Sequence, residues 1–186
     1  MEIIAGSDDS VVQGKAIASL KRITGVLNSA TINEQYVDLI GRLDEGDYYS
    51  MRIAACQLYA QVYQKLGEEK QEVVRQKFSK LVKDDTPMVR WGAAQSMAVI
   101  VHALSQDTIE NFLLPLLKEL LTDKNDSVKV HAVQSSVVVC ELIDNPETIA
   151  QQIVPALKQA YMNKQSWRLR FAVAESAARI GLKMRK

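Results

Sequence analysis

The side chains of this chain that could do acid–base or metal chemistry are few and lie far apart. Its 186 residues contain two histidines, His102 and His131, and two cysteines, Cys56 and Cys140. Metal sites and catalytic dyads need several such groups at short, regular spacing, and neither histidine has a thiol or paired carboxylates at such a distance. We therefore interpret the histidines as structural and the cysteines, which lie in apolar runs, as small buried side chains.

One acidic segment, Asp123-Lys124-Asn125-Asp126, begins like a calcium-binding loop. Such a loop needs glycine at its sixth position and an acidic residue at its twelfth, where this chain has Val128 and Gln134. The sequence also contains no glycine-rich phosphate loop and no nucleophile elbow. These observations predict a protein that is not an enzyme, with no catalytic residues, no metal site and no cofactor.

An internal repeat indicates which elements could position a functional surface. A five-residue pattern recurs from positions 12, 51, 89, 128 and 167, which are 39, 38, 39 and 39 residues apart. Its first residue is small or apolar, its second is usually basic, the next two are variable and the fifth is small or apolar. The five segments are Val12-Gln13-Gly14-Lys15-Ala16, Met51-Arg52-Ile53-Ala54-Ala55, Val89-Arg90-Trp91-Gly92-Ala93, Val128-Lys129-Val130-His131-Ala132 and Trp167-Arg168-Leu169-Arg170-Phe171. This period is typical of HEAT and armadillo helical hairpins. The function of such an array lies on its repeated surfaces rather than in a pocket.

Each repeat is predicted to contain two helices. The first helices are expected at 31–43, 69–83, 107–122 and 147–162, and the second helices at 9–27, 47–66, 86–104, 126–143 and 166–183. Thr86-Pro87 is a typical helix start with proline at the first helical position, and Asp126-Ser127 and Ser166 offer similar caps. Pro115 and Pro155 lie inside first helices, where proline removes a hydrogen bond and bends the axis.

The predicted fold class is all-α, a right-handed α-solenoid of about four and a half HEAT hairpins. We expect one array over 1–186, with a partial repeat at 1–27 and repeats at 28–66, 67–104, 105–143 and 144–183. No outer helix fits before the segment 9–27, and the chain stops just after another second helix. Because the terminal repeats of a solenoid need polar caps, we expect either a segment of a longer array or ends that pack against another copy.

The charge and hydropathy of the chain argue against several classes of partner. Basic and acidic residues almost cancel, to a formal net charge of +1, whereas binding to a nucleic-acid backbone needs a strongly basic face. No apolar stretch approaches the roughly 18 residues of a membrane span, and the N-terminus lacks the basic start of a signal peptide. We therefore expect no nucleic acid and no membrane as partner, and a cytoplasmic location, with the nucleus as a second location.

Four of the repeat turns carry a family resemblance. They are Gly46 to Arg52, Asp84 to Arg90, Asn125 to Lys129 and Lys164 to Phe171. In this order they resemble consecutive repeats of the scaffold (A) subunit of protein phosphatase 2A (PP2A), and the similarity runs from about Asp8 to Gly181. The string Asp-Asp-Thr-Pro-Met-Val-Arg at 84–90 is specific, whereas Val-Arg-x-x-Ala is shared by HEAT proteins generally.

The resemblance implies a non-catalytic scaffold segment of the PP2A holoenzyme. In that family the C-terminal repeats hold the catalytic phosphatase subunit, and the N-terminal repeats hold exchangeable regulatory subunits, mainly through the turns between the two helices of each repeat. The repeats matched here are those that meet regulatory subunits. Phosphatase regulatory subunits are therefore the expected partners, and the catalytic subunit is expected only if a longer chain has the C-terminal repeats.

Candidate partner-binding residues lie at or just after these turns, where stacked repeats would align them. They are Tyr48, Tyr49, Pro87, Met88, Arg90, Trp91, Ser166, Trp167 and Arg168. Aromatic residues and arginine are enriched in protein interfaces. The 39-residue spacing places Trp167 at the position of Val89 and Val128, so we expect its ring to lie partly in the core and partly at the interface.

Basic side chains recur in phase at Arg52, Arg90, Lys129 and Arg168. Such a ladder more often ties one repeat to the next than it contacts a partner, and both roles stay open. Trp91 stands where the phosphatase scaffold family typically has a second basic residue. Because an indole has one donor and no charge, the resemblance does not carry an ionic contact to this position, and packing over the neighbouring repeat is the alternative role of the ring.

Two other functions are weighed against this one. A HEAT adaptor of the transport-receptor or chromosome-organising type has the same kind of repeat, and longer repeats or acidic inner faces would favour it. A HEAT-fold DNA glycosylase needs a concave face rich in lysine and arginine and a catalytic carboxylate beside aromatic side chains. The near-neutral charge argues against the glycosylase.

Overall fold

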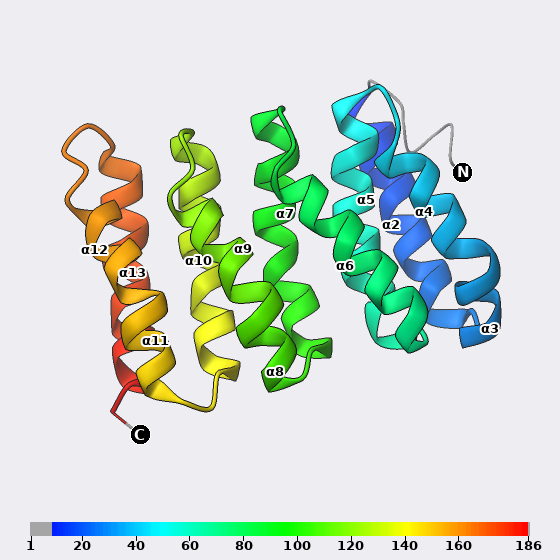
Figure 1. Cartoon of the computed structure of the whole chain (residues 1–186). Coiled ribbons are helices and arrows are strands. Elements are labelled where there is room, and N and C mark those ends of the chain that lie inside the picture. The colour runs from blue at the N-terminus through cyan, green and yellow to red at the C-terminus, as the bar shows by residue number, and fades with distance from the viewer. Residues whose placement is uncertain (1–8, 186) are drawn as a thin grey trace. The chain divides into compact units, whose positions relative to one another are not determined.

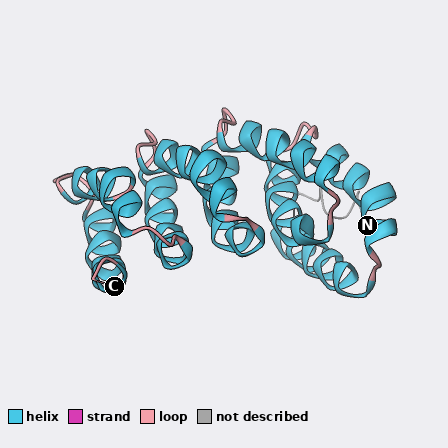
Figure 2. Ribbon diagram, turned by 60° about the horizontal axis from the view of Figure 1, so that its bottom comes forward, coloured by secondary structure: helices cyan, strands magenta, loops and turns pink. Residues whose placement is uncertain are grey.

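The computed structural model describes residues 9–185 and shows helices joined by short turns, with no strand in that range (Figure 2). The chain folds as two compact units, 1–96 and 97–186, and their boundary falls inside one helix. No helix within residues 9–185 is both long and apolar enough to cross a membrane. The division of the chain into one array with the predicted repeat limits stays a prediction.

Unit 1 is built around α5. Its elements are α2 (Ser10–Val26), α3 (Ser29–Thr31), the π-helical segment η1 (Ile32–Tyr36), α4 (Val37–Asp44), α5 (Tyr49–Val62), the 3-10 segment η2 (Tyr63–Lys65), α6 (Glu68–Val82) and the first part of α7 (Pro87–Ile100) (Figure 1). Helix α5 packs against α2, α4 and α6. It is buried on most sides because Ala54, Ala55 and Cys56, which are completely buried, let neighbouring helices approach closely.

Unit 2 places α10 at the centre in the same way. Its elements are the end of α7, the 3-10 segment η3 (Val101–Ala103), α8 (Gln106–Thr108), the π-helical segment η4 (Ile109–Leu113), α9 (Leu114–Leu121), α10 (Asp126–Leu142), α11 (Pro146–Gln152), α12 (Val154–Tyr161) and α13 (Trp167–Lys183). Helix α10 packs against α9 and α13, and α13 also packs against α12. Val128, Ala132 and Val139 of α10 are completely buried between these helices.

The predicted helices are confirmed. Each of the nine predicted segments is helical in the structure, and each end lies within two residues of its predicted position. The all-α fold class follows from the alternation of long helices and tight turns, which the sequence repeat already indicates.

Two first helices of unit 2 are interrupted where prolines were expected to disturb them. Pro115 follows η4, in which the Leu114 amide donates to the Ile109 carbonyl five residues earlier rather than four. Pro155 follows the break between α11 and α12 at Ile153. Proline has no amide hydrogen and clashes with the carbonyl four residues before it, so these breaks relieve a steric conflict. The segment η1 in unit 1 has the same π geometry without any proline.

Side-chain caps fix where the second helices begin. The Ser166 hydroxyl accepts from the Leu169 amide at 3.4 Å, as predicted for the start of α13. The prediction for α10 was wrong by one residue: the cap is Asn125, whose Oδ1 accepts from the Ser127 amide at 2.9 Å, and Asp126 is the first helical residue. An Asn side chain is as good an N-cap as Asp, so composition alone did not distinguish the two positions.

Candidate functional site

Three of the turns before the second helices share one local structure. In each, the first polar residue of the turn accepts a hydrogen bond from the backbone amide two residues later. The distance is 2.8 Å for Asp84, 2.7 Å for Asp123 and 3.0 Å for Asn163. This Asx turn reverses the chain within a few residues, so the side chains that follow are held at the edge of the unit.

An arginine at the fourth position of a second helix closes the turn before it. Arg52 Nη1 donates to two turn carbonyls at 2.8 and 3.0 Å, Arg90 Nη1 donates at 2.7 and 3.1 Å, and Arg170 Nη1 donates to two at 2.9 Å. The planar guanidinium has five donors in a fixed fork, so it can bind several carbonyls at once. We call these residues the turn arginines.

The turn arginines correct the frame of the last repeat. Counted from the first residue of each second helix, the fourth positions are 52, 90, 129 and 170, so the last spacing is 41 residues and not 39. The side chain aligned with Val89 and Val128 is therefore Leu169, and all three are completely buried. Trp167, predicted at that position, is the first residue of α13 and is 63% exposed, so the expected core contribution of its ring is wrong.

The same correction moves the last member of the basic ladder. Arg168 does not close the turn, because Arg170, two residues later in the first turn of α13, does so. Instead the guanidinium carbon of Arg168 lies 5.2 Å from the centre of the Trp167 ring. This is a cation–π distance, and both side chains are exposed.

In unit 1, Arg52 also ties its own turn to the next one. Its Nε donates to Asp84 Oδ2 at 2.8 Å and its Nη2 to Asp84 Oδ1 at 3.3 Å and Thr86 Oγ1 at 3.2 Å. The side chains of Arg52 and Asp84 are only 19% and 13% exposed. A two-point, largely buried ion pair is among the stronger polar contacts in proteins. The interpretation of the ladder as a tie between repeats is confirmed at this position.

In unit 2, the corresponding tie is made by a carboxylate. Lys129 Nζ lies 2.7 Å from Asp126 Oδ1, one helical turn earlier. This ammonium holds the pKa of Asp126 below its ordinary value, and a hydrogen bond with the Ser166 side chain lowers that pKa further. Asp126 therefore connects the start of α10 to the start of α13 through a hydroxyl group rather than through a second ion pair.

The structure sorts the candidate partner-binding residues by exposure. The exposed fractions of the four large side chains are 59% for Tyr48, 51% for Tyr49, 45% for Met88 and 63% for Trp167. Arg168 is also exposed, whereas Pro87, Trp91 and Ser166 are half-buried. Arg90 is only 7% exposed and donates to turn carbonyls, so it supports the turn from inside, and its role as a partner contact stays a prediction.

Sequence reasoning missed Phe171, which is 62% exposed. It lies four residues after Trp167 in α13, so the two rings lie on the same face of the helix. The 39-residue frame gave this residue only as the apolar last residue of the repeat pattern. A frame counted from the helix starts aligns it with Ile53, Trp91 and Val130, which are half-buried, so its exposure had no sequence signal.

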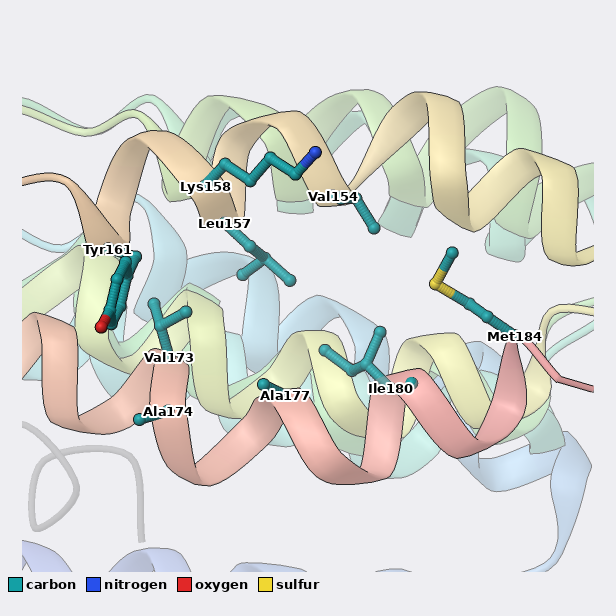
Figure 3. Close-up of a pocket in the computed structure, with 10 residues that line it drawn as sticks. Val154, Leu157, Lys158, Tyr161, Val173, Ala174, Ala177, Ile180 and Met184 are labelled. Atoms are coloured by element: carbon teal, nitrogen blue, oxygen red, sulfur yellow. The ribbon is translucent and has the colours of Figure 1, made fainter.

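An apolar groove runs between α12 and α13 (Figure 3). Its volume is about 370 Å³. Val154 and Leu157 of α12 face Ile180 of α13 and Met184, which follows that helix, across the groove. Among its lining residues in the described part of the chain, Lys158 alone is charged. A single amine among apolar side chains provides no acid–base pair, so the groove has the character of a packing surface.

The repeat explains why this face is apolar. With the spacing of 41 residues, Ala174 and Ala178 of α13 correspond to Val133 and Val137 of α10. Val133 and Val137 are buried and α10 packs against α13, whereas Ala174 and Ala178 are exposed. The groove is thus part of the face that one repeat uses to pack against its neighbour.

The two thiols and the His131 imidazole are buried or half-buried. Both cysteines are buried, as predicted, and burial raises the pKa of the Cys140 thiol to about 12 and that of Cys56 well above its usual range. Burial also lowers the pKa of the half-buried His131. Within residues 9–185 no group of three or more histidine, cysteine or acidic side chains is placed to hold a metal ion.

Sequence comparison relates the chain to proteins of one kind, although no family model matches it. A "probable serine/threonine-protein phosphatase PP2A regulatory subunit" of Caenorhabditis elegans is 32% identical over 144 residues, which is 77% of this chain and 24% of that protein. The regulatory (A) subunit of PP2A from Schizosaccharomyces pombe is 29% identical over 182 residues, 97% of this chain and 30% of that protein. The resemblance to the PP2A scaffold (A) subunit is confirmed. The beta isoform of the human 65 kDa regulatory (A) subunit is 34% identical over 108 residues, 58% of this chain and 18% of the isoform.

The chain spans less than a third of the length of these PP2A proteins. Among solved structures, that of Cex1p covers 96% of this chain and 34% of its own, with a TM-score of 0.74 and 16% identity. A designed armadillo repeat protein covers 96% of this chain and 80% of its own, with a TM-score of 0.60 and 16% identity. These likenesses concern the fold alone, and they confirm the solenoid class of helical repeats.

Proposed function

We propose that the chain is a non-catalytic scaffold segment of a PP2A holoenzyme that binds phosphatase regulatory subunits through its repeat turns. The observation that carries this proposal is that two groups of side chains have different roles in the turns. Arginines on the inner side hold the backbone, while large apolar side chains remain exposed at the edge of each unit. The similarity to PP2A scaffold (A) subunits supports the choice of partner class.

The arrangement suits binding for an energetic reason. Association costs free energy for every flexible side chain and loop that becomes ordered. A turn whose carbonyls are already bound by Arg52, Arg90 or Arg170 loses little further freedom when a partner arrives. Tyrosine and tryptophan are enriched in interfaces because they bury a large area with few rotatable bonds. Methionine is enriched because its flexible side chain adapts to the partner.

The proposal extends to the surroundings of the protein. Regulatory subunits are the partners of this segment, and the catalytic subunit binds only where a longer chain supplies further repeats. Nucleic acids and membranes have no role in it, and the site of action is the cytoplasm, with the nucleus as the second location. A transport or chromosome-organising adaptor is the competing assignment.

In unit 1 the test is a pair of turn substitutions with a matched control. Tyr48→Ala with Tyr49→Ala removes two exposed rings at the turn, and we expect binding of a purified PP2A regulatory subunit to weaken about tenfold, the usual effect of losing interface anchors. Val73→Ala removes an apolar side chain that is 37% exposed on α6, and it should leave the affinity unchanged. Surface plasmon resonance gives the affinities, and circular dichroism checks the helix content.

In unit 2 the corresponding pair is Trp167→Ala with Arg168→Ala, and the control is Leu182→Ala, which lies at the other end of α13 and is 62% exposed. We expect a similar loss for the first variant and none for the control. Unchanged affinity in both turn variants, with helix content preserved, would overturn the proposal that the turns bind the partner.

A further inference from the structure

The exposed charged residues of the two turns before α10 and α13 have one sign. Between Met162 and Arg170 the chain has three basic residues and no acidic one. Lys164 and Arg168 are exposed, and the preceding turn adds an exposed Lys124. In unit 1, by contrast, the turn at 44–52 has three acidic residues and one basic one. A net charge near zero for the whole chain therefore conceals a local basic face.

The acidic side chains of these two turns do not cancel that charge, because residues 122–129 and 162–170 contain two acidic residues and five basic ones. Asp126 is paired with Lys129 at 2.7 Å and is hydrogen-bonded to the Ser166 side chain. Asp123 accepts from the Asn125 amide at 2.7 Å. Both residues are half-buried as a whole, with the Asp126 side chain 46% exposed, whereas Lys124, Lys164 and Arg168 are exposed. The fully exposed charged residues of these two turns are thus all positive.

The basic face also has an aromatic platform in a fixed place. The Trp167 ring has Arg168 over it at 5.2 Å, an arrangement that leaves the N–H edge of the guanidinium available to a carboxylate. Arg170 donates to the Asn163 and Lys164 carbonyls at 2.9 Å each, which fixes the backbone beneath the platform. Phe171, on the same face of α13, enlarges the apolar area.

We propose that this basic turn face, made of Lys124, Lys164, Trp167 and Arg168, binds an acidic segment of a partner protein. This rests on the proposed function and specifies the chemistry of the partner at unit 2. The starts of α10 and α13 lie side by side, and packed helices are about 8–10 Å apart. An extended chain advances about 3.3 Å per residue, so carboxylates three residues apart match Lys124 and Lys164. An apolar side chain beside them covers Trp167.

A protein segment fits this face better than a nucleic acid does. Binding to a phosphate backbone uses many basic contacts along an extended stripe, whereas this face has three exposed charges and one exposed indole ring. The platform supplies apolar area that an acidic peptide with a hydrophobic residue can bury. Binding of a single-stranded oligonucleotide is therefore the competing outcome that the experiment has to exclude.

The test uses the full chain and a fluorescein-labelled synthetic peptide with two glutamates three residues apart and one leucine between them. A second peptide with lysine in place of both glutamates is the charge control. We expect fluorescence anisotropy to show binding of the acidic peptide only. The affinity should fall several-fold between about 50 and 300 mM salt, because exposed charges are screened over that range.

Substitutions then locate the binding. Lys164→Glu with Arg168→Glu reverses two charges of the face and should weaken the acidic peptide about tenfold. Lys158→Glu, at an exposed lysine on α12 of the same unit, is the matched control and should have no effect. Lys164→Gln with Arg168→Gln provides a milder variant should the double reversal lose helix content. Equal affinity in the Gln variant and the unsubstituted chain would overturn the inference, as would tighter binding of an oligonucleotide than of the peptide.

Capture of a purified PP2A regulatory subunit by the same variants separates this inference from the proposed function. Retained capture without any binding of the acidic peptide overturns the inference and leaves the proposed function in place. Peptide binding without capture of any regulatory subunit overturns the proposed function, and assigns the acidic segment to a different protein. Loss of both in the Lys164→Glu, Arg168→Glu variant, with both intact in Lys158→Glu, supports the two together.

Discussion

In both units a side chain links one turn to the next, but the interaction that makes this link differs between the units. In unit 1 a turn arginine, Arg52, reaches across to Asp84 and Thr86 of the next turn and is itself largely buried. In unit 2 the residue at the same helical position is Lys129, which pairs with Asp126 of its own helix. The link to the next turn passes through the Ser166 side chain instead.

This difference shows what a substitution of arginine by lysine costs in a repeat. A guanidinium can serve two carbonyls and a carboxylate at once, whereas an ammonium is a compact point charge with three donors. Unit 1 therefore uses its arginine as a tie between turns. Unit 2 lacks that ion pair between turns, and Lys124, Lys164 and Arg168 are exposed at its turns.

The largest expected effect tests the frame of the last repeat. Leu169→Ala should lower the free energy of unfolding by about 3 kcal/mol, because the Leu169 side chain is completely buried and its removal leaves a cavity. Trp167→Ala should cost about 0.5 kcal/mol or less, because its ring is 63% exposed. Urea denaturation followed by circular dichroism measures both. A larger loss for Trp167→Ala than for Leu169→Ala would restore the 39-residue frame.

The second prediction compares the ties between turns. Arg52→Ala should cost about 2 kcal/mol, because it leaves the largely buried Asp84 carboxylate without its cation. Lys129→Ala breaks a pair within one helix whose Asp126 side chain is 46% exposed, and should cost about 0.5 kcal/mol. Arg52→Lys should recover little of the stability, because one ammonium cannot replace the fork. Equal losses in the two alanine variants would show that the units are tied alike.

The third prediction separates two neighbouring arginines of α13. Arg170→Ala removes two hydrogen bonds to turn carbonyls and should cost about 1 kcal/mol. Arg168→Ala removes an exposed side chain that lies over the Trp167 ring, and should be nearly neutral for stability. Thermal unfolding of both variants in parallel provides the comparison, and a greater destabilisation by Arg168→Ala would contradict the assignment of the turn arginine.

The smallest effect concerns pH. Both histidines of the chain lie in unit 2, and burial lowers the pKa of His131 below its ordinary value of 6.5. The unfolded chain therefore binds a proton at this position more readily, so this contribution to stability is present above pH 6.5 and is lost as the pH falls through the lowered value. The urea midpoint should fall between about pH 7.5 and 5, and His131→Gln should reduce that slope. An identical slope in the variant would remove His131 as the cause.

The helices and the fold class could be predicted from the sequence because they depend on local signals repeated several times. Thr86-Pro87 and Ser166 mark helix starts in any context, and the repeat overrides weak local preferences. The exposure of the turn residues could not be predicted as well. In the last repeat the second helix begins two residues later than the 39-residue spacing predicts, so Leu169 and not Trp167 occupies the buried position. Only the position of the helix start shows this shift.

The role of individual charges was also beyond the sequence. Arg52, Arg90 and Arg168 occur in one pattern, yet the first ties two turns, the second is buried behind its own turn and the third is exposed beside an indole ring. These outcomes depend on which carbonyls and carboxylates lie within reach in three dimensions. Spacing along the chain does not contain that information.

The central claim is that the exposed turn residues form the binding edge of the scaffold. Oxidative footprinting with mass spectrometry, with and without a purified PP2A regulatory subunit, tests it most directly. We predict that binding protects Tyr48, Tyr49, Met88 and Trp167 and leaves Val26 and Leu182, which are 83% and 62% exposed, as reactive as before. Binding of the regulatory protein with protection at Val26 or Leu182 and none at the turn residues would contradict the claim.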